Sequence, residues 1–195
     1  MQLKDYQKCW NTKPVLREIY HNLYQKIENN LLIGDTLEIG GGIGNLQLNE
    51  GRVVKTDIQY YSGVDVVADA QKLPFKKESF DAVISGFLLR NVPSIEKTLV
   101  EQFRVGRKKA KLASLDTTPP ERNWLAPFIN IYLNKIIPLM GRLIVGDSFA
   151  YKYLSDSTQE FLDADKLSEK IELAGFVEVG YWKKMFKTMA IHWGN

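Results

Sequence analysis

Short apolar runs alternate with longer amphipathic ones along the first part of the chain. The short runs are rich in Val, Ile and Leu, which is typical of strands that are buried on both faces of a parallel sheet. We expect such strands at Thr36–Ile39, Arg52–Thr56, Val64–Val67, Ala82–Ser85 and Ala110–Leu115. Helical patterns lie at Pro14–Asn29, where the proline suits a first turn, and at Ser94–Phe103 after Pro93.

The C-terminal part adds a helix and two further strands. The helix is expected at Asp163–Ala174, where Gly175 provides its stop, and an antiparallel pair of strands at Phe176–Met185 and Lys187–Trp193. A strand, a glycine-rich turn, a helix and a second strand ending in an acidic residue form the first half of a doubly wound sheet. The pattern predicts an α/β, Rossmann-like fold with a mostly parallel sheet and an antiparallel C-terminal strand.

Two segments depart from a regular version of this fold. The connection Ile58–Gly63 has six residues, too few for a crossover helix, so we expect the sheet to be trimmed near its third strand. The apolar segment Trp124–Val145 contains prolines, asparagines and basic residues, which would be costly in a membrane-spanning helix. We expect it to form buried helices, in a lid-like insertion around residues 121–150 of a single domain over 1–195.

The composition restricts the class of protein but does not indicate a binding partner. A chain of 195 residues that is 45% hydrophobic and 25% charged is typical of one globular domain, and a net charge of +3 is too small to predict nucleic-acid binding. Cys9 is the single cysteine, and His21 has no partner at ligand spacing, so no internal disulfide and no metal site are expected. The first ten residues lack the apolar run of a secretory signal, so we expect a cytoplasmic protein.

The glycine-rich turn after the first strand is the first candidate for ligand binding. Gly40, Gly41, Gly42 and Gly44 let the backbone turn sharply and present N–H groups to a ligand, but they do not fit the GxGxxG spacing of dinucleotide sites. Glu38, two positions earlier, favours a ligand that carries a cation over a pyrophosphate. The alternative is a structural turn with an exposed glutamate.

Acidic residues also end the next two strands. Asp57 follows the second strand, where a carboxylate can accept hydrogen bonds from the two hydroxyls of a ribose. Asp69 and Ala70 follow the third strand, where they could meet an adenine edge. Either aspartate alone could be a strand-end cap, since loops favour Asp. Three acidic strand ends in order predict a nucleoside-containing ligand.

These motifs, in this order, resemble those of class I S-adenosylmethionine-dependent methyltransferases. The matching residues are Glu38-Ile39-Gly40-Gly41-Gly42-Ile43-Gly44-Asn45, Asp57, Ala68-Asp69-Ala70 with Leu73-Pro74-Phe75, and Ser79-Phe80-Asp81-Ala82-Val83-Ile84-Ser85. The resemblance implies that S-adenosylmethionine is the cofactor. Gly40 and Gly42, with Glu38, would then hold its methionine part, and Asp57 its ribose. Asp69 and Ala70 would hold its adenine, and Ser85 would line the side of methyl transfer.

The later motifs are similar to those of the C-methyltransferases of ubiquinone and menaquinone biosynthesis. They are Gly86-Phe87-Leu88-Leu89-Arg90-Asn91-Val92, Ile137-Pro138-Leu139-Met140-Gly141, Asp147, Tyr151-Lys152-Tyr153-Leu154-Ser155-Asp156-Ser157 and Ala190-Ile191-His192-Trp193-Gly194. The similarity implies C-methylation of a demethylmenaquinol-like lipid quinol, with possible peripheral membrane contact. Arg90 is the first catalytic candidate, because a cation near the ring oxygen would stabilise a phenolate. Asp147, Tyr151 and Tyr153 are further candidates at the substrate mouth.

Several alternatives stay open at this point. The acceptor could be another small molecule, or the protein could bind S-adenosylmethionine without catalysis. Arg90 could form a surface salt bridge, and His192 could be a buried imidazole instead of a base. The basic run Arg104 to Lys111 could meet anionic lipid, or it could be a solvated loop.

Overall fold

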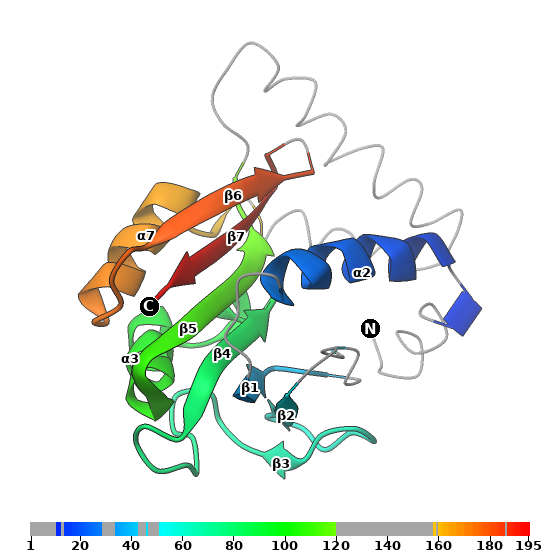
Figure 1. The fold of residues 1–195 in the computed structure, drawn as a ribbon. Coiled ribbons are helices and arrows are strands. Elements are labelled where there is room, and N and C mark those ends of the chain that lie inside the picture. The colour runs from blue at the N-terminus through cyan, green and yellow to red at the C-terminus, as the bar shows by residue number, and fades with distance from the viewer. Residues whose placement is uncertain are drawn as a thin grey trace.

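The protein forms a single mixed sheet with helices on both faces (Figure 1). The structure is a computed structural model that describes residues 11–12, 14–28, 34–42, 46, 51–119, 158, 160–185 and 187–195. Within these ranges the strands are β1 (Asp35–Ile39), β2 (Arg52–Asp57), β3 (Val66–Val67), β4 (Phe80–Gly86), β5 (Gly106–Thr117), β6 (Gly180–Lys184) and β7 (Met189–Gly194). The helices are α2 (Pro14–Glu28), the 3-10 turn η1 (Leu89–Asn91), α3 (Ile95–Val105) and α7 (Ala164–Leu173).

The strand order confirms the predicted doubly wound topology. The order is β3-β2-β1-β4-β5-β7-β6, and β1 to β5 run parallel to their neighbours. The strand β7 pairs antiparallel with β5, and β6 pairs antiparallel with β7. From β1 the chain continues outward to β2 and β3, and it then returns to the other side of β1 to form β4 and β5. The loops after β1 and β4 therefore lie where ligands bind in open α/β sheets.

The predicted ends of several strands were wrong. The third strand was expected at Val64–Val67, but only Val66–Val67 pair with β2, because the backbone N–H of Val64 closes a turn onto the Tyr61 carbonyl. In the described connection from β2 to β3 there is no helix, which confirms the trimmed edge. The strand β5 starts at Gly106, four residues before its predicted start, and β6 starts at Gly180, four residues after its predicted start. Pairing with a neighbour decides where each strand begins.

Helix boundaries follow capping chemistry. The Ser94 side chain accepts the backbone N–H of Lys97 at the start of α3, and the Asp163 side chain accepts that of Lys166 at the start of α7. Gly175 follows α7 with φ +113°, a conformation that glycine adopts without strain.

The two faces of the sheet have separate apolar cores. Leu99 of α3 and Leu167 of α7 pack with Leu112 of β5, whereas Ile27 of α2 packs with Ala113 of the same strand. Successive side chains of a strand point to opposite faces, so α2 covers one face and α3 and α7 the other (Figure 1).

Candidate functional site

The glycine turn after β1 is fastened to the end of β2. The backbone N–H groups of Gly40 and Gly41 both donate to the Thr56 carbonyl, at 2.9 and 3.0 Å, and the Thr56 hydroxyl donates to the Glu38 carbonyl at 3.1 Å. Gly40 and Gly42 have φ values of +72° and +52°, in the left-handed region. The turn is therefore held in one shape by backbone contacts, before any ligand is considered.

Gly42 leaves open space above the turn. Among the residues that the structure describes, a Cβ atom built on Gly42 would meet nothing within 4 Å, whereas one on Gly40 would lie 2.9 Å from the Leu88 side chain. The two glycines thus differ: Gly40 allows close packing against Leu88, and Gly42 borders a cradle that a ligand could enter.

Glu38 lies buried beneath this turn. It is 4% exposed, and its Oε2 has no hydrogen-bond partner among the described residues. The pKa of the Glu38 carboxyl is raised to about 7, mainly by burial; the nearby Lys55 opposes this rise and Asp57 adds to it. A Cβ on Gly41 would lie 3.0 Å from Oε2, which places the carboxyl directly against the glycine turn. A buried carboxylate is costly without a partner, so a cationic ligand above the turn would stabilise its ionised form. The alternative of an exposed glutamate is wrong.

Asp57 joins the two loops that flank the cradle. Its Oδ2 accepts the Gly42 N–H at 3.0 Å, and its Oδ1 accepts the Gln59 N–H at 3.0 Å. The carboxylate is half-buried, and each of its oxygens can accept a further hydrogen bond. Asp57 is therefore a strand-end cap, as the alternative expected, and its contact with ligand hydroxyls stays a prediction.

Asp69 and Ala70 form a tight turn beside the end of β2. The Ala68 N–H donates to the Asp57 carbonyl at 2.9 Å, which brings the turn next to Asp57. The Asp69 carboxylate accepts the Gln71 N–H at 2.8 Å, and the Ala70 side chain belongs to the apolar core. Contact of this pair with an adenine stays a prediction, and it would have to use backbone groups or the free face of the Asp69 carboxylate.

The structure places the Ser85 hydroxyl inside the protein. Ser85 is 0% exposed, pairs with Ile39 in the sheet, and lies with its Oγ 3.3 Å from that of Ser114. The expected place of Ser85 at the side of methyl transfer stays a prediction.

Arg90 lies in η1, two residues after the Leu88 side chain that packs against Gly40, and is paired with Asp116 of β5. Its Nη1 donates to Asp116 Oδ1 at 2.9 Å, with the two side chains 11% and 2% exposed. Its guanidinium carbon lies 4.9 Å from the centre of the Phe87 ring. The alternative of a surface salt bridge is therefore wrong in one respect: the bridge exists, but it is buried.

The amino-acid sequence matches a known protein family over most of its length. A model of the ubiE/COQ5 methyltransferase family matches residues 24–195. The chain belongs to the ubiE/COQ5 methyltransferase family. The resemblance inferred from the sequence motifs is confirmed.

Curated members of this family include close relatives. The ubiquinone/menaquinone biosynthesis C-methyltransferase of Desulfotalea psychrophila is 47% identical over 133 residues, which cover 68% of this chain and 54% of the relative. A demethylmenaquinone methyltransferase of Roseiflexus sp. is 34% identical over 179 residues, which cover 83% of this chain and 75% of the relative. Against the Desulfotalea protein, and several others, the chain spans little more than half of the relative's length.

Solved structures share the fold at low sequence identity. A SAM-dependent methyltransferase of Thermotoga maritima has a TM-score of 0.62 at 19% identity, with 98% of this chain and 94% of that chain covered. A SAM-dependent methyltransferase of Aquifex aeolicus has a TM-score of 0.58 at 16% identity, with 88% of each chain covered. These likenesses support the Rossmann-like fold of this ubiE/COQ5 family member.

Sequence reasoning missed Asp116, which lies one residue before the end of β5. Burial raises the pKa of the Asp116 carboxyl, while Arg90 opposes that rise. The available signal was positional, since Asp116 is a further acidic residue at the carboxyl end of a parallel strand. Asp147, Tyr151 and Tyr153, together with the insertion at 121–150, lie outside the described residues.

His192 of β7 is a buried imidazole, which was one of the two alternatives expected from the sequence. Its Nε2 lies 3.0 Å from the Ala164 carbonyl, which can only accept, so Nε2 carries the proton. Nδ1 has no partner in the described part of the chain, and burial lowers the pKa of the imidazole. These contacts place His192 under α7 and not in the cradle.

The basic run lies at the opposite edge of the sheet from the glycine turn. Arg104 donates to the carbonyls of Phe75 and Leu73 and pairs with Glu101, and so fastens the loop before β4. Arg107 pairs with Asp81 at 2.5 Å. The run is therefore partly structural, and we do not include it in the site.

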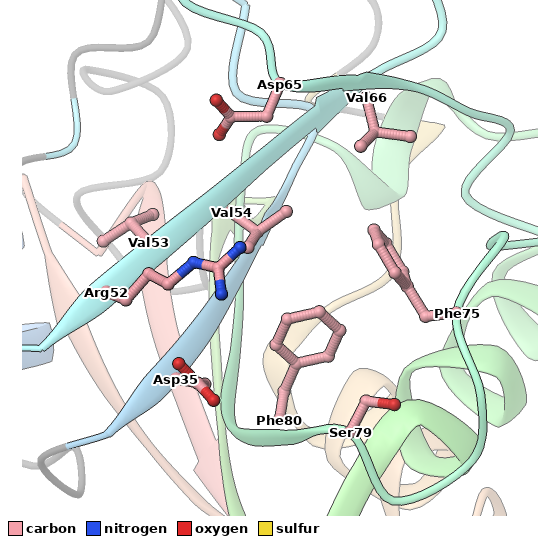
Figure 2. Close-up of a pocket in the computed structure, with 9 residues that line it drawn as sticks. All are labelled: Asp35, Arg52, Val53, Val54, Asp65, Val66, Phe75, Ser79 and Phe80. Atoms are coloured by element: carbon pink, nitrogen blue, oxygen red, sulfur yellow. The ribbon is translucent and has the colours of Figure 1, made fainter.

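A hollow of about 400 Å³ also lies at this opposite edge (Figure 2). Figure 2 shows Arg52 and Val54 of β2 on one side and the rings of Phe75 and Phe80 on the other. The rings meet edge to face with their centres 5.0 Å apart. Because ligands of open α/β sheets bind beyond the carboxyl ends of the strands, this hollow is not the cofactor site.

None of the helices among the described residues is long and apolar enough to cross a membrane. In the same parts of the chain, His, Cys, Asp and Glu side chains form no group of three or more that could hold a metal ion.

Proposed function

We propose that this protein is an S-adenosylmethionine-dependent methyltransferase that C-methylates a lipid quinol of the demethylmenaquinol type. The observation that carries the cofactor assignment is the buried Glu38 carboxyl, whose Oε2 has no partner among the described residues and faces the glycine turn. The names of the relatives support the acceptor, since they include a demethylmenaquinone methyltransferase and ubiquinone/menaquinone biosynthesis C-methyltransferases.

The residues around the turn fit S-adenosylmethionine. Glu38 would accept the cationic amino group of its methionine part, and the open side of Gly42 would admit that part without a clash. Asp57 would accept the ribose hydroxyls, with Asp69 and Ala70 on the adenine side. When bound, S-adenosylmethionine supplies a methyl group on a positively charged sulfur.

The acceptor would lie on the Arg90 side of the turn. The Arg90 guanidinium would stabilise the phenolate form of the quinol, in which the ring carbon is the better nucleophile. The methyl group then moves from sulfur to this carbon, and the ring proton is lost to water. Asp147, Tyr151 and Tyr153 stay candidates for positioning the ring. A polyprenyl tail would be met at a membrane surface, so we propose a peripheral contact there.

Calorimetric titration with S-adenosylmethionine and S-adenosylhomocysteine, with NAD as a control, tests the cofactor. We expect micromolar binding of the first two and none of NAD. Absence of binding would overturn the proposal. Methyl-labelled S-adenosylmethionine and a short-chain demethylmenaquinol then test the reaction. Transfer to other phenols only would indicate another small-molecule acceptor, and binding without any transfer would indicate a non-catalytic module.

A matched pair of variants tests the assigned pocket. Asp57→Asn should weaken S-adenosylmethionine binding about tenfold or more, because hydrogen bonds to a charged group contribute roughly 1.5–3 kcal/mol. Asp65→Asn is the control, since Asp65 likewise accepts a backbone N–H, that of Lys55 at 2.8 Å, but lies away from the turn. Equal losses in both variants would contradict the pocket.

A further inference from the structure

Asp116 and Arg90 come from neighbouring elements at the carboxyl edge of the sheet. Asp116 lies near the end of β5, and Arg90 lies in η1, shortly after β4. The strands β4 and β5 are parallel, with Gly86 opposite Leu115, so their ends bring the two residues together. The contact joins residues 26 positions apart in the chain.

The Asp116 carboxylate holds Arg90 at two points. Its Oδ1 accepts from the guanidinium Nη1 at 2.9 Å, and its Oδ2 accepts from the Arg90 backbone N–H at 3.2 Å. The Thr117 N–H donates to Oδ1 at 2.8 Å, which fixes the carboxylate itself. One side chain therefore sets both the path of the η1 backbone and the direction of the guanidinium.

The guanidinium has a donor that the described residues leave unused. Its Nε is buried and has no hydrogen-bond partner within the described ranges, while the Phe87 ring lies 4.9 Å from the guanidinium carbon. An ordered water would satisfy this buried donor. The charge is thus held in place before an acceptor arrives, which is the arrangement that makes electrostatic stabilisation effective.

Stability alone does not explain this ion pair. Removing two charges from water costs about as much as their attraction returns, and buried pairs are often replaceable by apolar residues without loss of stability. We propose that Asp116 is a positioning residue, which fixes the Arg90 guanidinium at the acceptor side of the site. This inference rests on the proposed function, because it needs a quinol oxygen for Arg90 to meet.

A double-mutant cycle of Arg90→Met, Asp116→Leu and the double variant tests the inference. We would measure kcat and KM for the quinol, the Kd of S-adenosylmethionine, and Tm. Each single variant should lose kcat about tenfold or more and should lower Tm, because it leaves one buried charge without its partner. The double variant should regain Tm but keep the low kcat of Arg90→Met, with Kd unchanged throughout.

The cycle separates positioning from a structural role. If kcat returns with Tm in the double variant, the pair is only structural, and the inference is overturned. If the losses of the two single variants multiply, Asp116 acts independently of Arg90, which also overturns it. If Asp116→Leu does not fold, Asp116→Asn replaces it in the test, because asparagine keeps the shape of the side chain and removes its charge. An unchanged kcat in Asp116→Asn would contradict the positioning role of Asp116.

Different results would overturn the proposed function and the inference about Asp116. A wild-type protein that binds S-adenosylmethionine but transfers no methyl group to the quinol overturns the proposed function and this inference with it. A wild-type protein that is active, and that loses activity on Arg90→Met but not on Asp116→Leu or Asp116→Asn, overturns the inference alone.

Discussion

Replacing Glu38 with glutamine should change folding stability and cofactor affinity in opposite directions. In the free protein the buried Glu38 carboxyl has its pKa raised from 4.5 to about 7 by burial. Below pH 4.5 the carboxyl is protonated in both the folded and the unfolded chain, and its burial costs little. Between pH 4.5 and 7 the unfolded chain ionises first, so folding stability falls as the pH rises, and the loss is complete above pH 7.

The size of this effect follows from the shift. At about 1.4 kcal/mol per pKa unit, the rise to about 7 corresponds to roughly 3 kcal/mol. Glutamine is neutral at every pH and escapes this penalty. We therefore expect Glu38→Gln to be more stable than the wild type at pH 8 by up to roughly 3 kcal/mol, and close to it at pH 4. At roughly 2–4 °C per kcal/mol, Tm at pH 8 would rise by on the order of 6–12 °C.

Binding should change the other way. The ionised carboxylate is the form that a cationic amino group would meet, so wild-type affinity for S-adenosylmethionine should rise with pH through about 7. The glutamine variant should bind roughly tenfold to a hundredfold more weakly, and without this pH dependence.

Thermal unfolding at pH 4 and pH 8, together with calorimetric titration of S-adenosylmethionine, measures both effects. Glu101→Gln is a control of opposite sign, because the hydrogen bond from Arg104 lowers the pKa of Glu101 and its carboxylate therefore stabilises the fold above its usual pKa. If Glu38→Gln lost stability at pH 8, or bound the cofactor as tightly as the wild type, the assignment of Glu38 would be refuted.

Two further variants probe the site and the core. Gly42→Ala should weaken S-adenosylmethionine binding about tenfold or more, and it should cost only about 1–2 kcal/mol of stability, because φ is +52° and the added Cβ meets no described residue within 4 Å. Unchanged affinity by calorimetry would place the cofactor elsewhere. His192→Gln should remove an acid sensitivity of folding. Burial lowers the pKa of His192, so the wild type loses stability as the pH falls below 6.5, where the unfolded chain takes up the proton first. Denaturant unfolding at pH 5 and pH 7.5 checks this, and equal acid sensitivity in wild type and variant would contradict it.

The sequence by itself determined the fold class, the order of the elements and the place of the glycine turn. These depend on local patterns: apolar runs, capping residues such as Ser94 and Asp163, and glycines that follow a strand. The topology then brings the residues of these local patterns together at one edge of the sheet, because parallel strands end on the same side. This is why Glu38, Gly42 and Asp57, which are up to 19 positions apart, were correctly grouped from sequence.

Only the tertiary structure decided what each side chain meets. Glu38 was expected beside the turn, but its burial, and with it the raised pKa, comes from packing. Arg90 was recognised, whereas its partner Asp116 lies 26 positions later in the chain. Ser85 was expected to line the side of methyl transfer, and only the structure shows that its hydroxyl is buried against that of Ser114. A contact between distant segments depends on strand register and on the face to which each side chain points, and a one-residue change in register reverses that face. Local patterns carry no such information, so the pairings at this site follow from the folded arrangement of β4, β5 and the glycine turn.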